Sequence, residues 1–96
     1  MAVHFVWDPK KAAANLLKHR VTFEEDVTVF RDPLARIHGD PRHSVGERRE
    51  ILVGHSTQHR LILVSFTERA KTVRLIGARR ATRHERREYE EFTKSP

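Results

Sequence analysis

The sequence predicts a small α+β domain in which helices pack on one face of a mainly antiparallel sheet. Three strand-like runs near the centre of the chain are joined by short polar turns, as in a meander of hairpins. Helix-start signals precede these runs and follow them. With 96 residues there is room for one domain, spanning 1–96, whose core must come from two packed layers.

The N-terminal third predicts one strand and two helices. Residues 3–7 are typical of a short strand, and Asp8-Pro9 then begins a helix that runs to about His19. Its apolar positions fall at helical spacing and are expected to face the core: Ala13, Leu16 and Leu17. The segment 22–25 is a capping box for a shorter helix, which the segment 31–33 ends.

The remainder of the chain predicts four strands and a final helix. Residues 34–38 are expected to form an edge strand, and residues 39–46 a polar loop. The three stronger strands cover 49–55, 60–67 and 72–79. Thr82 and Glu85 form a further capping box, so we expect a helix from there to about Thr93.

Composition favours a polyanionic partner. Lys and Arg total 19 against 13 Asp and Glu, a net charge of +6, which suits RNA, DNA or an acidic protein. The chain has no cysteine, which excludes disulfides and a thiolate nucleophile, and we expect no metal site and no cofactor. No apolar stretch is long enough to span a membrane and no signal segment begins the chain, so a cytoplasmic protein is expected.

Arg79 and Arg80 are the first candidates for contact with phosphate. Arginine binds phosphate through two N–H groups at once and stays charged at any working pH. Because side chains alternate along a strand, only one of the two can face the ligand, and we favour Arg79. The alternative is a solvated pair, or an ion pair with Glu85 or Glu68.

Proton-transfer candidates lie in the polar loop and in the last hairpin turn. His43 and Glu47 pair an imidazole with a carboxylate four residues away, although Ser44 and Glu47 also fit a capping box. Glu68 is expected to approach Arg79 across neighbouring strands, or to form only a hairpin salt bridge. These candidates would supply a base and an acid for proton transfer.

Further contacts with RNA are expected from residues on or beside the last strands and helix: Arg49, Arg69, Lys71 and Tyr89. The phenol of Tyr89 would stack on a base or donate to a phosphate. Its spacing of three from Phe92 fits core packing equally well.

Short motifs occur in register along nearly the whole chain: Phe5-Val6-Trp7-Asp8-Pro9-Lys10-Lys11, Asn15, Lys18-His19, Val21-Thr22-Phe23-Glu24-Glu25, Val29-Phe30-Arg31-Asp32, His43-Ser44, Glu47-Arg48, Gly54-His55-Ser56, Thr67-Glu68-Arg69, Ile76-Gly77-Ala78-Arg79-Arg80-Ala81-Thr82, Glu85-Arg86 and Tyr89-Glu90. In their order and spacing they resemble the BrnT-type toxins of bacterial toxin–antitoxin pairs. One departure is Arg20, where a glycine ending the first helix would be expected.

The resemblance implies a fold similar to the RelE-like ribonucleases and RNA cleavage that inhibits translation. It also implies neutralisation by a BrnA-type antitoxin in a 2:2 complex, with operator DNA bound only through the antitoxin. Two other functions fit the same residues: a non-catalytic nucleic-acid-binding subunit of a repressor complex, and a translation inhibitor that acts only on ribosomes.

Overall fold

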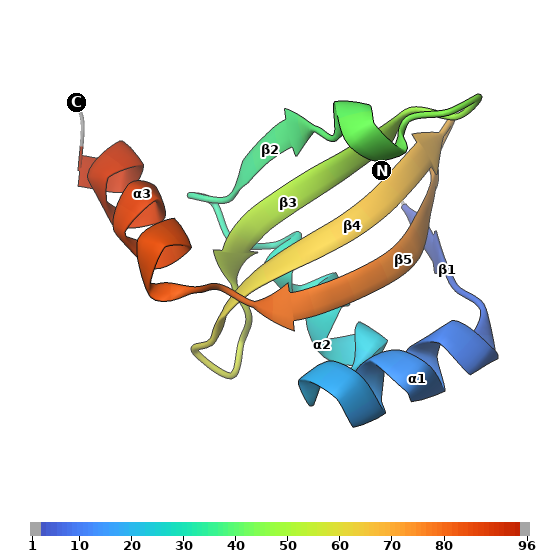
Figure 1. Ribbon diagram of the computed structural model, residues 1–96, viewed down its shortest axis with the longest axis horizontal. Coiled ribbons are helices and arrows are strands. Elements are labelled where there is room, and N and C mark those ends of the chain that lie inside the picture. Colours follow the sequence, from blue (N-terminus) through green and yellow to red (C-terminus); the bar gives the residue numbers. More distant parts are fainter. Residues whose placement is uncertain (1–2, 95–96) are drawn as a thin grey trace.

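The computed structural model describes residues 3–94, which form a five-stranded sheet with helices on both of its faces (Figure 1). In chain order the elements are β1 (His4–Val6), α1 (Pro9–His19), α2 (Phe23–Val29), β2 (Arg36–Gly39), the single 3-10 turn η1 (Pro41–His43), β3 (Arg49–His55), β4 (Leu61–Arg69), β5 (Thr72–Arg80) and α3 (Arg83–Lys94). The predicted α+β class is confirmed.

The sheet has the order β1-β5-β4-β3-β2 and is mainly antiparallel, as expected. Strands β2 to β5 pair antiparallel with their neighbours, whereas β1 pairs parallel with β5. The first strand of the chain therefore lies beside the last one. Strands β1 and β2 form the two edges of the sheet.

Helices α1 and α2 lie on one face of the sheet, and the main core is formed between α2 and that face. The buried side chains that alternate inward from the strands include Leu52, Ile62, Val64, Phe66 and Leu75. From the helical side, Val21, Phe23 and Val29 are fully buried against them. Val27 of α2 and Phe30, the residue that caps this helix at its C-terminus, pack against this cluster.

Helix α1 contacts the sheet through a polar residue rather than through its leucines. Asn15 is buried; its Nδ2 donates to the carbonyl oxygen of Val21, and its Oδ1 accepts from the backbone N–H of Ala78. Leu16 and Leu17 are 44% and 82% exposed and Ala13 is exposed as well, so the expectation that these three residues face the core is wrong. The helix ends at Arg20, whose φ of 59° is the left-handed conformation that glycine usually supplies.

The third helix, α3, lies over one end of the opposite face, whereas we expected the helices on one face only. Its buried residue is Tyr89, which packs with Val53 and Leu61 of the sheet. Most of the other residues of α3 are exposed, so the helix contacts this face only around Tyr89 and the pocket beside it. Among the helices of residues 3–94, none is long and apolar enough to cross a membrane.

Candidate active site and RNA-binding face

The sheet face that α1 and α2 leave uncovered, here called the open face, carries side chains in rows set by the strand register. In the row beneath α3, Arg36 lies opposite Val53, Val53 opposite Leu63, and Leu63 opposite Arg79. In the next row His38 lies opposite Ile51, which is followed by Ser65 and Gly77. Two cations therefore flank an apolar strip, with an imidazole beside one of them.

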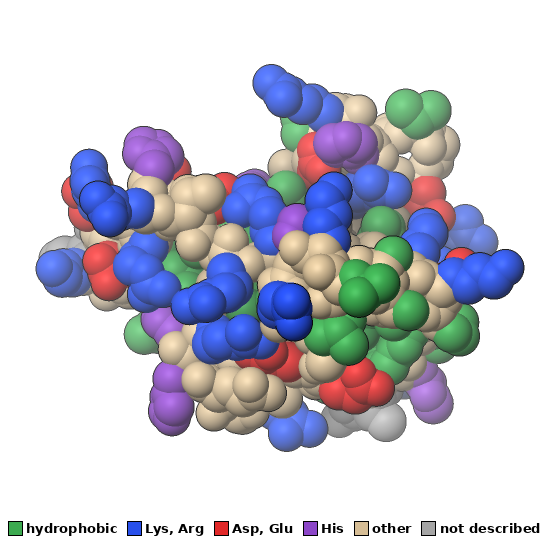
Figure 2. Space-filling view, turned by 60° about the horizontal axis from the view of Figure 1, so that its bottom comes forward, with side chains coloured by type: hydrophobic (Ala, Val, Ile, Leu, Met, Phe, Trp, Pro, Cys, Tyr) green, Lys and Arg blue, Asp and Glu red, His purple; other side chains and the backbone are tan. Residues whose placement is uncertain are grey.

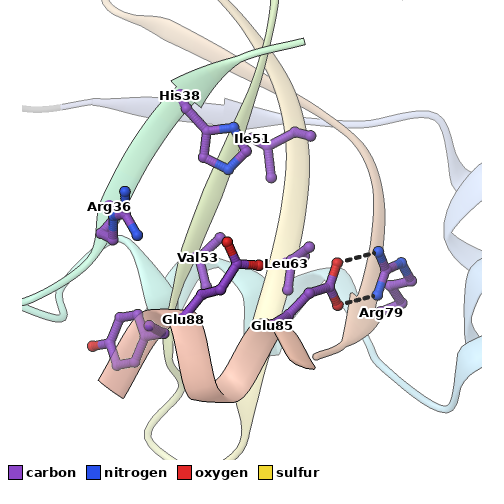
Figure 3. Close-up of a pocket in the computed structure, with 9 residues that line it drawn as sticks. Arg36, His38, Ile51, Val53, Leu63, Arg79, Glu85 and Glu88 are labelled. Atoms are coloured by element: carbon purple, nitrogen blue, oxygen red, sulfur yellow. Dashed lines mark hydrogen bonds and ion pairs between the residues drawn. The ribbon is translucent and has the colours of Figure 1, made fainter. Parts of the chain in front are cut away.

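A pocket of about 390 Å³ lies between α3 and these rows, and we call it the α3 pocket. Its floor is apolar, formed by Ile51, Val53 and Leu63. Its walls are charged: Figure 3 shows side chains from β2 on one side and Arg79 of β5 on the other, with two carboxylates of α3 between them. The pocket lining is completed by Arg36, His38, Arg79, Glu85, Glu88 and Tyr89.

Arg79 is held in place by Glu85 through a two-point ion pair. Its Nη1 and Nη2 each lie 2.8 Å from a carboxylate oxygen of Glu85. The hydrogen bonds from Arg79, which outweigh partial burial, lower the pKa of Glu85 to about 2. Three of the five N–H groups of this guanidinium are used, counting a longer bond to the carbonyl oxygen of Arg80. The remaining donors leave Arg79 an oriented cation that can still bind a phosphate.

Arg80 does not share the pocket. It lies opposite Ile62, whose side chain belongs to the core under α2, so Arg80 is on the face opposite to Arg79. There its positive charge contributes to lowering the pKa of Glu25. Strand alternation thus separates the two arginines as expected, with Arg79 on the open face, and the structure gives no support to a joint role of Arg80 in the same site.

His43 has a different carboxylate partner from the one predicted. Its Nδ1 lies 2.8 Å from Oδ2 of Asp40, and its side chain is 59% exposed. The Ser44 hydroxyl accepts from the backbone N–H of Arg49 instead of capping a helix, so the alternative capping box is wrong. Glu47 lies instead beside a shallow groove with Thr67 and Arg74. The expected pairing of His43 with Glu47 is therefore replaced by an Asp40–His43 pair.

The expected approach of Glu68 to Arg79 is wrong. Glu68 lies opposite Val73, whereas Arg79 lies opposite Leu63. Leu63 and Glu68 are five residues apart in β4, which corresponds to about 17 Å along the strand. Glu68 also lies on the other face, beside Phe5. No chemistry at Arg79 can use this carboxylate directly.

A further row of the open face is cationic. Arg49 lies opposite Thr67, and Thr67 opposite Arg74, which the sequence analysis did not single out. The Nε of Arg49 is buried and has no hydrogen-bond partner among the described residues. Arg69 follows at the end of β4, and Lys71 is exposed in the turn after it. Figure 2 shows several Lys and Arg side chains near the centre of the face that it presents, with others around its margin.

Tyr89 is a packing residue. It is 3% exposed, and its hydroxyl donates to Oδ2 of Asp32 at 3.0 Å. Burial and this hydrogen bond raise its pKa to about 12. Its ring packs edge-on against His55, with 5.3 Å between the ring centroids. The prediction that Tyr89 stacks on an RNA base is therefore wrong, and the alternative of core packing is confirmed.

The edge strand β2 contributes two residues to the pocket that were not predicted from the sequence. Arg36 and His38 are two residues apart and therefore share one face of the strand, and both line the α3 pocket. The alternation Arg36-Ile37-His38 carried this signal, but it could be interpreted only once the neighbouring strand and its register were known.

Within residues 3–94 no group of three or more His, Cys, Asp or Glu side chains is placed to hold a metal ion.

Comparison with known proteins supports a nuclease family. The model of the family described as "Ribonuclease toxin, BrnT, of type II toxin-antitoxin system" matches residues 7–85. The crystal structure of the Brucella abortus ribonuclease toxin BrnT superposes with a TM-score of 0.67 at 19% identity, covering 85% of this chain and 100% of that one. The search of curated proteins returned no match. Because the family match spans most of the chain, the protein belongs to the BrnT family of ribonuclease toxins of type II toxin–antitoxin systems.

Proposed function

We propose that the protein is a metal-independent endoribonuclease that cleaves RNA in the α3 pocket and thereby inhibits translation. The observation that carries this proposal is the content of one pocket: two guanidinium groups, an imidazole and two carboxylates around an apolar floor. Family membership supports the substrate class, since the family is one of ribonuclease toxins. The neighbouring row of Arg49 and Arg74 would hold adjacent phosphates of the same strand.

The chemistry follows from the roles that these groups can take. The carboxylate of Glu88 accepts the proton of a ribose 2′-hydroxyl, and the 2′-oxygen attacks the adjacent phosphorus. Arg79 and Arg36 stabilise the negative charge that develops on the phosphate oxygens. The imidazolium of His38 donates a proton to the leaving 5′-oxygen as the P–O5′ bond breaks. The products are a 2′,3′-cyclic phosphate and a free 5′-hydroxyl.

The direct test is cleavage of end-labelled RNA by the purified toxin in EDTA. Each proton-transfer group contributes on the order of 10²–10⁴-fold, so His38→Ala and Glu88→Gln should each slow cleavage by at least about 100-fold. Removal of one charge-stabilising donor costs about as much, which sets the expectation for Arg79→Ala. His43→Ala is the matched control, because this imidazole lies outside the α3 pocket.

Each outcome has a distinct meaning. Fragments ending in 2′,3′-cyclic phosphate that disappear in His38→Ala and persist in His43→Ala support the proposal. Loss in His43→Ala alone would move the proton transfer to the Asp40–His43 pair. Intact free RNA together with cut messenger RNA on ribosomes would establish the ribosome-dependent inhibitor. Intact RNA in both settings, with binding retained, would leave a non-catalytic subunit of a repressor complex.

The partner proposed for this toxin is a BrnA-type antitoxin in a 2:2 complex, with operator DNA bound through the antitoxin alone. A type II toxin has a protein antitoxin, and the net charge of +6 favours an acidic surface on it. Mass determination of the co-purified complex tests the stoichiometry, and a mass other than that of two copies of each protein would contradict it. We place this activity in the cytoplasm, where messenger RNA is available.

A further inference from the structure

Strand β2 is an edge whose outer side offers backbone groups for pairing. The sheet order ends at β2. The N–H of Asp40 donates to the carbonyl oxygen of Arg49 at 2.9 Å, in register with the β2–β3 pairs. Backbone hydrogen bonds involve every second residue of a strand in an antiparallel pair. Since Asp40 bonds to β3, the backbone groups of Arg36 and His38 also bond to β3. The backbone N–H and C=O groups of Ile37 and Gly39 therefore face outward.

The two sides of this edge differ chemically. On one side the Ile37 side chain is 57% exposed and lines an apolar groove of about 540 Å³ that also contains Phe30 and Phe66. On the other side Arg36 and His38 face the α3 pocket. A strand added at β2 would meet apolar surface through every second side chain and cationic groups through the others.

We propose that the β2 edge binds an extended segment of the acidic antitoxin, in which carboxylate and apolar side chains alternate. The existence of that partner rests on the proposed function. The positive charge beside the β2 edge favours an acidic segment over a second copy of this chain. A second copy of this chain, paired edge to edge, would bring its own Arg36 and His38 to the same side and repel, whereas carboxylates at these positions attract.

Pairing at this edge explains how the antitoxin would inhibit the enzyme. Carboxylates of the added strand would lie beside Arg36 and His38, on the wall of the α3 pocket. They would compete with RNA phosphate for Arg36 and would hold a negative charge where the substrate must enter. The segment would then neutralise the toxin without covering the whole open face.

The test compares two substitutions at one position in the complex with the co-expressed BrnA-type antitoxin. Ile37→Pro removes the outward N–H, and proline is tolerated at such a position of an edge strand. Ile37→Ala shortens the same side chain but keeps the N–H. Because one partner carbonyl is left unsatisfied, we expect Ile37→Pro to bind the antitoxin at least about 10-fold more weakly than Ile37→Ala. Matching thermal melts of the two free variants establish that both are folded.

Amide hydrogen exchange on the wild-type protein is the second readout. Binding of the antitoxin should protect the amides of Ile37 and Gly39, which face outward in the free toxin. Equal affinities of the two variants, or unprotected amides in the complex, would overturn the proposal. Protection in concentrated free toxin would identify a second copy as the occupant and would also overturn it.

RNA cleavage by the free variants separates this proposal from the proposed function. Ile37 lies outside the α3 pocket, so both variants should cleave RNA in EDTA at the wild-type rate. A wild-type protein that binds its antitoxin through β2 but cuts no RNA would overturn only the nuclease. An active enzyme that binds its antitoxin without contact at β2 would overturn only the proposal for the β2 edge. If no complex forms at all, both the proposed antitoxin partner and the proposal for the β2 edge would be overturned.

Discussion

At the scale of single residues, Asp26 is a carboxylic acid in an environment that does not favour its charged form. It lies in α2, is fully buried, and both of its carboxylate oxygens have no hydrogen-bond partner among the described residues. Burial, reinforced by the negative charge of Glu25, raises its pKa to about 8. The folded protein therefore holds Asp26 as a neutral acid at pH 7.

This environment predicts that Asp26 costs stability as the pH rises. Below the unfolded-state pKa of about 3.9, both states are protonated and there is no cost. Between that value and a folded pKa of about 8, the unfolded state loses the proton and the folded state keeps it, so stability falls. Asp26→Asn should therefore raise the melting temperature relative to wild type by more at pH 8 than at pH 4. Melting curves of both proteins check this, and a difference that does not change with pH would contradict it.

Glu25, the neighbour of Asp26, has a cationic partner, and the direction of its pKa shift is opposite to that of Asp26. Its carboxylate accepts from the guanidinium of Arg60 and from the hydroxyl of Ser56. The hydrogen bond from Arg60, opposed by burial, lowers the pKa of Glu25. The two acidic residues are adjacent in sequence, yet one is held ionised and the other neutral, because only one of them reaches a cation.

At the scale of elements, α3 is the part of the fold that is attached by few contacts. Tyr89 donates to Asp32, Glu85 pairs with Arg79, and the guanidinium of Arg36 lies 3.9 Å from the ring centroid of Phe92. Burial within the helix is confined to Tyr89. Because these contacts are mostly polar or ionic, the position of α3 over the pocket should depend on pH.

Acid should release α3 before the core unfolds. The pKa of Glu85 is lowered to about 2, so its pairing with Arg79 stabilises the docked helix above the unfolded value of about 4.3 and is lost as the pH falls from there toward 2. Hydrogen bonds from His55, Leu34 and Tyr89, opposed by burial, hold the pKa of Asp32 below its usual value as well. Amide exchange in residues 83–94 should therefore accelerate in this range while that of β4 remains slow.

Two variants test whether the ion pair of Glu85 is responsible for the release of α3 in acid. Glu85→Gln removes the titrating group of the ion pair, so its α3 should already exchange faster at pH 7 and change less on acidification. Tyr89→Phe keeps the ion pair but loses a hydrogen bond to a charged acceptor, worth about 1.5–3 kcal/mol, and should keep the acid step. Simultaneous exchange of α3 and β4 amides in the wild type would show that the helix does not detach separately.

At the scale of the whole molecule, the open face of the sheet carries a set of four arginines. The open face carries Arg36, Arg49, Arg74 and Arg79 in register, whereas the other face is largely covered by α1 and α2. A cationic face of this kind attracts RNA independently of its sequence. Binding should therefore weaken steeply as the salt concentration rises.

The salt dependence can be assigned to individual arginines. For single-stranded nucleic acid, each neutralised phosphate contributes about 0.7 to the slope of log K against log salt concentration. Arg49→Ala and Arg74→Ala should each flatten the slope by about that amount. Arg31→Ala is the matched control, because Arg31 lines the apolar groove on the other face. Equal effects of all three substitutions would show that RNA binding is not confined to the open face.

The sequence by itself determined the local structure and the family. The capping boxes at Thr22 and Thr82 begin helices where expected, with Thr22 accepting from the N–H of Glu25 and Thr82 from that of Glu85, because a cap depends only on residues a few positions apart. The strands appear close to their predicted bounds, since alternation and turn residues are also local signals. Strand alternation likewise separated Arg79 from Arg80.

Only the tertiary structure decided which residues form the site. Register placed Arg36, His38 and Arg79 around one pocket and moved Glu68 to the far end of a hairpin and to the other face. Packing buried Tyr89, and the buried contacts of Asn15 left Leu16 and Leu17 exposed. The physical reason is common to these cases. A side chain's spacing along the chain fixes its local conformation, whereas its partners depend on segments tens of residues away that meet only when the sheet forms.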